Sequence, residues 1–229
     1  NMESQKTFVI SLGGSMIVPD SVDTAFVRSF AEFIRSRVAL GEKFFIVCGG
    51  GRVARRYQDA LTELGNVDHD SLDWVGIGAT RLNAMLVKEY LKDIAYPDIV
   101  TDPTNAIDTD KAVVVGAGWK PGWSTDYVAI ALAKNNSASR VINISNVDHV
   151  YSADPRTNPD ATKYDDLAWS TYRDIIPREW TPGMSSPFDP MAAALAEEGG
   201  IEVAILHGSL LSELSNVLEQ KPFNGTLIH

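Results

Sequence analysis

The sequence predicts an α/β protein built around a mainly parallel sheet. Short runs of β-branched and apolar residues alternate with amphipathic stretches of helical period, and each run ends in glycine or a polar turn. The run at 44–48 is apolar throughout, as expected for a strand that is covered on both faces. These observations favour strands that lie side by side, each followed by a crossover helix.

The elements follow in order from this pattern. We expect strands at 8–10, 44–48, 99–100, 112–115, 141–144, 203–206 and near 226–227. Helices are expected from about residue 23, after Gly51, at about 73–92, and at 125–134, 190–197 and 210–218. The segment 146–166 contains Asp-Pro, Asn-Pro and Asp-Asp pairs and is expected to be an exposed loop. Because no linker or repeat interrupts the pattern, we expect one domain over 1–229, with Asn1, which precedes Met2, an expression scar.

Composition excludes several classes of function. The 229 residues carry a formal net charge of −10, which disfavours general binding to nucleic acid or to an anionic membrane. The sequence shows neither a bilayer-spanning apolar run nor a secretory signal, so we expect a cytoplasmic protein. The single cysteine, Cys48, is expected in the core, and the four histidines lack metal-ligand spacing, so we assign no protein metal site.

Three glycine clusters stand where a strand ends and a helix is about to begin: Gly13-Gly14, Gly49-Gly50-Gly51, and the loop from Gly116 to Gly122. Parallel strands place such turns on one edge of the sheet, where glycine lets backbone N–H groups approach an anion. Tight turns alone would explain one cluster. Three on one edge favour a phosphate site, although neither a P-loop nor a dinucleotide fingerprint is present.

Cations follow the second glycine cluster. Arg55 stands one helical turn after it and would point back toward a phosphate, whereas Arg52 and Arg56 fit a solvated helix face equally well. Lys120 lies within the third glycine loop, where it either covers a phosphate oxygen or faces water. Trp119 and Trp123 flank the same loop and either stack on a base or shield the loop.

Carboxylates accompany these cations at the same edge of the sheet. Asp126 begins a helix, and Asp148 and Asp154 follow the strand at 141–144. Asp126 alone would suit a helix N-terminus without any catalytic role. Cations, a carboxylate and backbone donors together are the groups that phosphoryl transfer needs.

Seven motifs follow one another along the chain: Ser11-Leu12-Gly13-Gly14-Ser15, Gly49 to Tyr57, Gly76 to Ala84, Pro121 to Asp126, Asn146 to Pro155, Asp189 to Ala193 and Gly225 to Ile228. Together they resemble the amino acid kinase family, and within it the uridylate (UMP) kinases of the archaeal type. They match in order and spacing over nearly the whole chain, and the most specific are Thr-Arg-x-Asn-Ala and Asn-Val-Asp-x-Val-Tyr.

The resemblance implies conversion of UMP and ATP to UDP and ADP with Mg²⁺, on a three-layer αβα sandwich that assembles as a homohexamer. Asp126 would organise the site, with Arg55 and Arg52 as catalytic cations. The implied ATP-binding residues are Gly14, Ser15, Gly51, Arg55, Ser145, Asn146, Tyr151 and Asp154. The implied UMP-binding residues are Gly50, Asp73, Trp119, Lys120, Pro121, Gly122, Trp123, Ser124 and Thr125.

Two residues depart from the family pattern. Ser11 stands where many members have a lysine that stabilises the transferring phosphoryl group. Archaeal uridylate kinases also lack this lysine, so the serine is tolerable if Arg52, Arg55 or Lys120 compensates. His149 replaces a usual glycine, and a positive φ there would strain it.

Three functional hypotheses follow. The first is a uridylate kinase, and the second is a non-enzymatic nucleotide or oxyanion storage protein on the same fold, which Ser11 supports. The third is a kinase for an acyl or carbamoyl acceptor. Asp73 and the loop at 121–125 favour a nucleotide acceptor over the third hypothesis.

Overall fold

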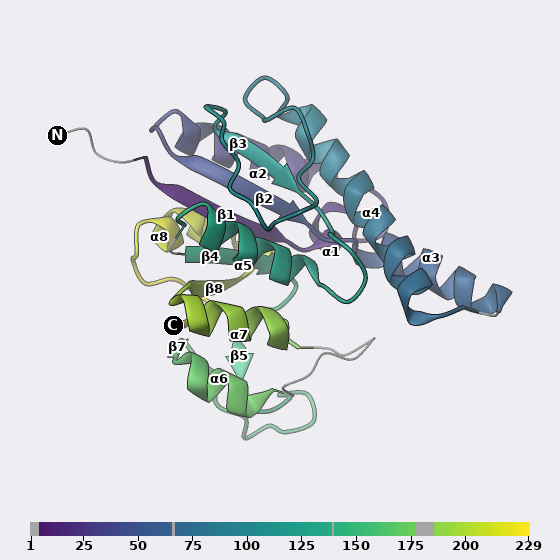
Figure 1. The fold of residues 1–229 in the computed structure, drawn as a ribbon. Coiled ribbons are helices and arrows are strands. Elements are labelled where there is room, and N and C mark those ends of the chain that lie inside the picture. Colours follow the sequence, from purple (N-terminus) through teal and green to yellow (C-terminus); the bar gives the residue numbers. More distant parts are fainter. Residues whose placement is uncertain (1–4, 66, 139, 177–185) are drawn as a thin grey trace.

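A seven-stranded, mostly parallel sheet forms the centre of the computed structural model, which describes residues 5–65, 67–138, 140–176 and 186–229 (Figure 1). Within these residues the strand order is β3-β2-β1-β4-β8-β9-β7. Strand β9 is antiparallel to β8, and the other pairings of this sheet are parallel. The strands are β1 (Thr7–Leu12), β2 (Lys43–Cys48), β3 (Val113–Gly116), β4 (Arg140–Ser145), β7 (Asp166–Leu167), β8 (Glu202–His207) and β9 (Thr226–Ile228).

Helices cover both faces of this sheet and give three layers. One face packs against α2 (Thr24–Val38), α4 (His69–Tyr90) and α8 (Leu214–Leu218). The other packs against α5 (Thr125–Asn135), α6 (Trp169–Ile175) and α7 (Pro190–Gly199). In Figure 1, α5 and α7 lie in front of the sheet. The predicted α/β sandwich is therefore confirmed.

Alternation along the strands explains the two cores. In β2, Phe44, Ile46 and Cys48 face the α2 side, while Phe45 and Val47 face the α5 side, and all are buried. Two-sided burial accounts for the continuous apolar run that the sequence shows. Burial raises the pKa of the Cys48 thiol to about 12, which agrees with its predicted place in the core.

The central strands end together. Leu12 of β1 pairs with Cys48 of β2 and with Ile144 of β4, and Val47 pairs with Gly116 of β3. The three glycine clusters therefore lie at one edge of the sheet, as predicted. The helices that follow them are α1 (Gly14–Ile17), α3 (Gly51–Leu64) and α5.

Some predicted elements differ in the structure. Helix α4 begins at His69, four residues before the predicted start, because Asp68 caps it by accepting the Ser71 backbone N–H. The strand predicted at 99–100 is wrong: Val100 forms one isolated bridge with Gly116. The helix predicted at 210–218 is a 3₁₀ turn, η1 (Gly208–Glu213), followed by α8.

The sequence pattern also missed several short elements. Helices α1 and α6 were not predicted, and the loop at 146–166 contains an antiparallel pair, β5 (Val150–Tyr151) with β6 (Lys163–Tyr164). None of the described helices is long and apolar enough to cross a membrane. Asn1, the expected scar, lies outside the described residues.

Candidate functional site

The first two glycine turns pack backbone against backbone. A Cβ on Gly14 would lie 2.2 Å from the Gly51 nitrogen. Gly51 has φ +59°, and a Cβ on it would lie 2.4 Å from the carbonyl carbon of Gly14. Both positions therefore require glycine. The contact brings the N-terminus of the 14-residue helix α3 against Gly14 and Ser15. The partial positive charge of a helix N-terminus favours an anion there.

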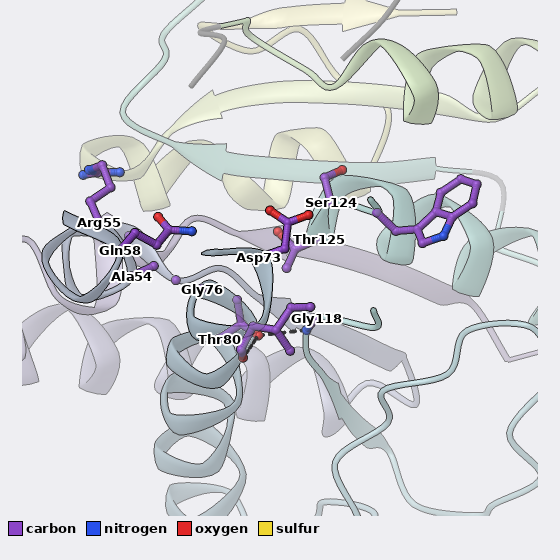
Figure 2. A pocket seen from close by; sticks show the side chains of 13 residues that line it. Ala54, Arg55, Gln58, Asp73, Gly76, Thr80, Gly118, Ser124 and Thr125 are labelled. Carbon is purple, nitrogen blue, oxygen red and sulfur yellow. Dashed lines mark hydrogen bonds between the residues drawn. The ribbon is translucent and has the colours of Figure 1, made fainter. Parts of the chain in front are cut away.

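A pocket of about 270 Å³ lies between α3, α4 and the third glycine loop (Figure 2). Figure 2 shows Arg55 and Gln58 of α3 on one side, and Asp73 of α4 with Ser124 and Thr125 on the other. Gly50, Gly51 and Trp123 also line it. The fold thus brings together predicted residues from three separate stretches of sequence.

Asp73 also shapes the third glycine loop. Its Oδ2 accepts a 2.8 Å hydrogen bond from the backbone N–H of Gly122, which has φ +93°. The Trp123 ring packs on Tyr127, with the ring centroids 4.4 Å apart. Asp73 therefore closes the loop at the residue next to Trp123, a member of the pocket wall.

Four residues predicted to bind the acceptor do not line this pocket: Trp119, Lys120, Pro121 and Gly122. Lys120 instead holds its Nζ 4.2 Å from the centroid of the Trp119 ring. The third glycine loop contributes Gly118 to the pocket, and the three residues after the loop, Trp123, Ser124 and Thr125, also line it. A contact of the other four with a ligand stays a prediction.

Asp126 is held by three neutral donors at the start of α5. Oδ1 accepts from Ser11 Oγ at 3.0 Å and from Asn143 Nδ2 at 3.0 Å, and Oδ2 accepts from the Asp189 backbone N–H at 3.3 Å. The residue is partly exposed, but its carboxyl group lies deep in the site. Burial, followed by repulsion from the Asp189 carboxylate, raises the pKa of Asp126 to about 6 despite these hydrogen bonds.

Asp189 joins the two helices that carry the site. Its carboxylate caps α7 by accepting the Met191 backbone N–H at 3.1 Å, and it accepts from Ser124 Oγ at 2.5 Å. Ser124 in turn caps α5 by accepting the Tyr127 N–H at 3.1 Å. The starts of α5 and α7 are therefore fixed to each other, with Asp126 between them.

The cations of α3 differ in their surroundings. Arg52 and Arg56 both pair with Asp20, Arg52 with its NH1 nitrogen 3.7 Å from the Asp20 Oδ1, and neither lines the pocket. Arg55 is exposed, lines the pocket and joins no ion pair with another described residue. Arg55, which the resemblance assigned to ATP, thus lines the same pocket as Gly50 and Asp73, which it assigned to UMP. Catalytic roles for Arg55 and Arg52 stay predictions.

A second pocket of about 600 Å³ follows β4, between 146–156 and the residues at 175–176 and 186–187. Predicted Asn146, Tyr151 and Asp154 line it, and Ser145 lies beside it, accepting the Val147 N–H at 3.1 Å. The hydrogen bond from the Arg156 side chain holds the pKa of Asp154 below its usual range. Four of the eight residues predicted to bind ATP thus lie at or beside this pocket, whereas Gly51 and Arg55 line the first pocket.

His149 does not have the positive φ that we considered for it. Ser137 and Gln220 are the non-glycine residues with positive φ in the part of the chain that the structure describes. The His149 ring is buried, with Nδ1 3.1 Å from the Asp148 Oδ2. Burial raises the pKa of Asp148, but hydrogen bonds from His149 and Tyr151 outweigh this effect and lower it overall.

Sequence reasoning missed several residues of these walls and supports. Gln58, Gly76 and Thr80 line the first pocket, and Ser11, Asn143 and Asp189 hold Asp126. Helical spacing offers a signal for the first group: Gln58 follows Arg55 by three residues, and Gly76 and Thr80 follow Asp73 by three and seven. Asn143 and Ser11 are direct neighbours on paired strands, which spacing along the chain does not reveal.

The chain is similar to known proteins over most of its length. The model of the amino acid kinase family matches residues 6–207. A uridylate kinase from Methanospirillum hungatei is 36% identical over 226 residues, covering 97% of this chain and 94% of that protein. One from Pyrococcus abyssi is 35% identical over 217 residues, covering 93% and 95%.

Solved structures show the same similarity. The crystal structure of uridylate kinase from Archaeoglobus fulgidus superposes with a TM-score of 0.83 and 34% identity, covering 97% of this chain and 99% of that one. The UMP kinase from Bacillus anthracis has a TM-score of 0.79 at 20% identity, covering 99% and 97%, which shows the shared fold.

Proposed function

The chain belongs to the amino acid kinase family, and from this premise we propose that it is a uridylate kinase, which converts UMP and ATP to UDP and ADP. The observation that carries the proposal is that Arg55 and Asp73 line one pocket together with Thr125, the residue before Asp126. A guanidinium suits a phosphate, and a carboxylate suits the hydroxyl donors of a ribose. Both relatives named above, with at least 35% identity, carry the name uridylate kinase.

The reaction needs positioning more than acid–base chemistry. Because Arg55 shares the pocket with Asp73, we assign it to the phosphate of UMP and not to ATP as the resemblance implied, and Asp73 accepts from the ribose. A UMP phosphate oxygen attacks the γ-phosphorus of ATP, a new P–O bond forms, and the bond to the β–γ bridging oxygen breaks to release ADP. No side chain has to remove a proton, because this oxygen is already anionic.

Asp126 organises the centre of the site. Because its carboxylate binds the ends of β1 and β4 and the start of α7, it fixes these three elements around the start of α5. Above a pH of about 6 it is ionised and accepts all three hydrogen bonds. We assign it a positioning and electrostatic role in the transfer.

ATP fits the glycine turns, because Gly14 and Gly51 keep side chains away from the backbone that would meet its phosphates. Mg²⁺ prefers oxygen donors and is often held by one or two carboxylates together with substrate phosphates. The donors present fit this preference: the Asp126 carboxylate lies beside the buried Asn143 Oδ1, which accepts no hydrogen bond among the described residues. When bound with ATP, Mg²⁺ would screen the charge of the phosphate oxygens.

The storage hypothesis depended on Ser11, which lacks the charge of lysine. Ser11 is buried, and its hydroxyl donates to Asp126, so serine is an integrated part of this site. The acyl-acceptor hypothesis has no supporting contact in the pocket, where Asp73 and Trp123 suit a nucleoside. We therefore keep the uridylate kinase as the single proposal.

A coupled assay of ADP release tests the proposal. Mg-ATP is offered with UMP, CMP, dTMP or acetylglutamate at millimolar concentration, and we expect strong turnover with UMP. Arg55→Gln should raise KM for UMP at least tenfold, because it removes a charge-assisted contact. Arg56→Gln, one residue further on the exposed face, is the matched control and should stay near wild type. The absence of ADP release with every acceptor would reject the proposal.

We also propose a homo-oligomer, with a hexamer as the expected form, acting in the cytoplasm as a single domain. Support comes from large apolar side chains on α3 and α4 that stay exposed, including Leu64 (83%), Tyr57 (66%) and Leu82 (61%). Figure 1 shows α3 and α4 projecting beyond the edge of the sheet. A second copy would cover such surface. Light scattering should report a multimer for the wild type and a smaller species for Leu82→Glu.

A further inference from the structure

One turn of α4 binds both loops that form the first pocket. Thr80 and Asn83 are three residues apart, so they share a face of the helix. Both are almost fully buried, with 6% and 3% of their surface exposed. They belong to the Thr-Arg-x-Asn-Ala motif, to which neither the resemblance nor the proposed reaction has yet assigned a role.

Thr80 contacts the acceptor-side loop and the glycine turn together. Its Oγ1 accepts the backbone N–H of Gly118 at 2.9 Å and donates to the Ile77 carbonyl at 2.7 Å (Figure 2). Its methyl group faces the other wall, because a Cβ on Gly50 would lie 3.5 Å from Thr80 Cγ2. The Thr80 side chain therefore spans from Gly118 to Gly50, across one side of the pocket.

Asn83 binds the glycine turn alone. Its Nδ2 donates to the Gly49 carbonyl at 2.8 Å, with a longer contact of 3.4 Å to the Gly50 carbonyl. The turn it holds continues into Gly51, the residue that packs against Gly14. Asn83 thus acts on the part of the edge where the phosphates of both nucleotides would meet.

Arg81 reinforces the acceptor-side loop from the outer side of α4. Its NH2 nitrogen donates to the Trp119 carbonyl at 3.1 Å and lies 3.3 Å from the Gly118 carbonyl oxygen. Its guanidinium rests over the Trp74 ring, 5.9 Å from the centroid. The loop is therefore bound by its N–H groups and its carbonyls to one helix.

We propose that Thr80 and Asn83 are positioning residues for phosphoryl transfer, which set the separation between the acceptor loop at Gly118 and the phosphate-binding turn at Gly49-Gly50. The inference rests on the proposed function. Because the two loops follow different strands, β2 and β3, their spacing near the reacting atoms depends on what bridges them. α4 supplies this bridge through side chains, and a displacement of 1 Å is enough to slow a transfer reaction about 100-fold.

The test compares kinetic constants of matched variants. Thr80→Val keeps the shape but removes the acceptor for the Gly118 N–H, so KM for UMP should rise about fivefold, while KM for ATP stays within twofold. Thr80→Ser restores the hydroxyl and should return KM for UMP to within twofold of wild type. Asn83→Leu should instead lower kcat at least tenfold, because it frees the turn that both phosphates share.

Thermal unfolding and circular dichroism show which variants are folded. If Thr80→Val does not fold, Arg81→Lys takes its place, since it weakens the same loop from a partly exposed position and predicts the same rise in KM for UMP. Two results would overturn the inference: equal KM values for UMP in folded Thr80→Val and Thr80→Ser, or the same loss in kcat and in both KM values. Neither result would affect the proposed function, provided that the wild type turns over UMP. A wild type without UMP turnover would overturn the proposed function, and this inference with it.

Discussion

Replacing Asp126 by asparagine should make the protein more stable and less active. The substitution removes a carboxylate that lies deep in the site and is bound by neutral donors alone. The asparagine oxygen can keep the hydrogen bond from the Asp189 N–H. The side-chain nitrogen of the new asparagine can then donate to Ser11 Oγ. It can also donate to Asn143 when the Asn143 side-chain amide flips and presents its Oδ1, which has no partner among the described residues.

The magnitude follows from the pKa of Asp126. Its rise from 3.8 to about 6 is about 2 units, which corresponds to a penalty of at most about 3 kcal/mol at neutral pH. Because the residue is partly exposed, water screens part of this penalty, and we expect about 1 to 2 kcal/mol. The raised pKa carries no penalty in the free energy of unfolding below pH about 4, because Asp126 is then protonated in both the folded and the unfolded state. The cost accumulates between pH about 4 and 6 and is complete above pH 7.

Urea unfolding at low protein concentration measures this difference at pH 8 and pH 4.5. The gain of Asp126→Asn over the wild type should be largest at pH 8 and should shrink at pH 4.5. Asp98→Asn, at an exposed carboxylate, is the control and should change the unfolding free energy by less than about 0.5 kcal/mol at both pH values. Turnover should fall about 10²- to 10³-fold, with UMP binding largely kept.

Two results would refute the reasoning. A variant that is no more stable than the wild type at pH 8 would show that the Asp126 carboxylate is not strained by burial. Unchanged turnover would remove Asp126 from the reaction, whatever its effect on stability.

Three further expectations follow from the geometry. Gly51→Ala should destabilise the fold by about 2 to 5 kcal/mol in urea unfolding, because φ is +59° and a Cβ would meet backbone atoms. Gly78→Ala, in open space on α4, is the control and should stabilise the fold by about 0.5 to 1 kcal/mol. Equal effects of the two substitutions would contradict the close packing at Gly51. Asp73→Ala should mainly raise KM for UMP, by about tenfold in the coupled assay, and an unaltered UMP affinity would show that the acceptor lies elsewhere. Cys48 should react with a thiol reagent only upon unfolding, since burial raises its pKa to about 12, and rapid labelling of native protein would contradict this.

Local sequence determined most of the central fold. Strand β2 was predictable because its residues are apolar on both faces, and α2 because Asp23 caps it and its apolar residues recur with helical period. The four-residue helix α1 was not predictable, because it is held by contact with the Gly49 to Gly51 turn and has too few residues for a period. The bridge at Val100 likewise depends on its partner, Gly116.

Within the site, the sequence identified residues whose side-chain type and position next to a strand end or a helix start indicate ligand binding. Three glycines after an apolar strand, followed by Arg55, and an aspartate after Ser124-Thr125 are such signals. The functions of Thr80 and Asn83 were hidden, because their partners are 38 and 34 residues away in sequence and are backbone groups. Residues that position a site through backbone contacts leave no local chemical pattern, and only the fold reveals them.

Ser11 shows how the site is arranged without the lysine that many members of the family have at this position. With a serine donor, Asp126 receives no cation from the described residues, so burial is not offset and its pKa rises to about 6. A lysine at this position would pair with Asp126 and lower its pKa, at the same time as it met the transferring phosphoryl group. Ser11 brings no positive charge to the site, so we propose that Arg55 and the magnesium that accompanies ATP supply it. Arg55 suits this role, because it lines the pocket and joins no ion pair with another described residue, whereas Arg52 and Arg56 both pair with Asp20.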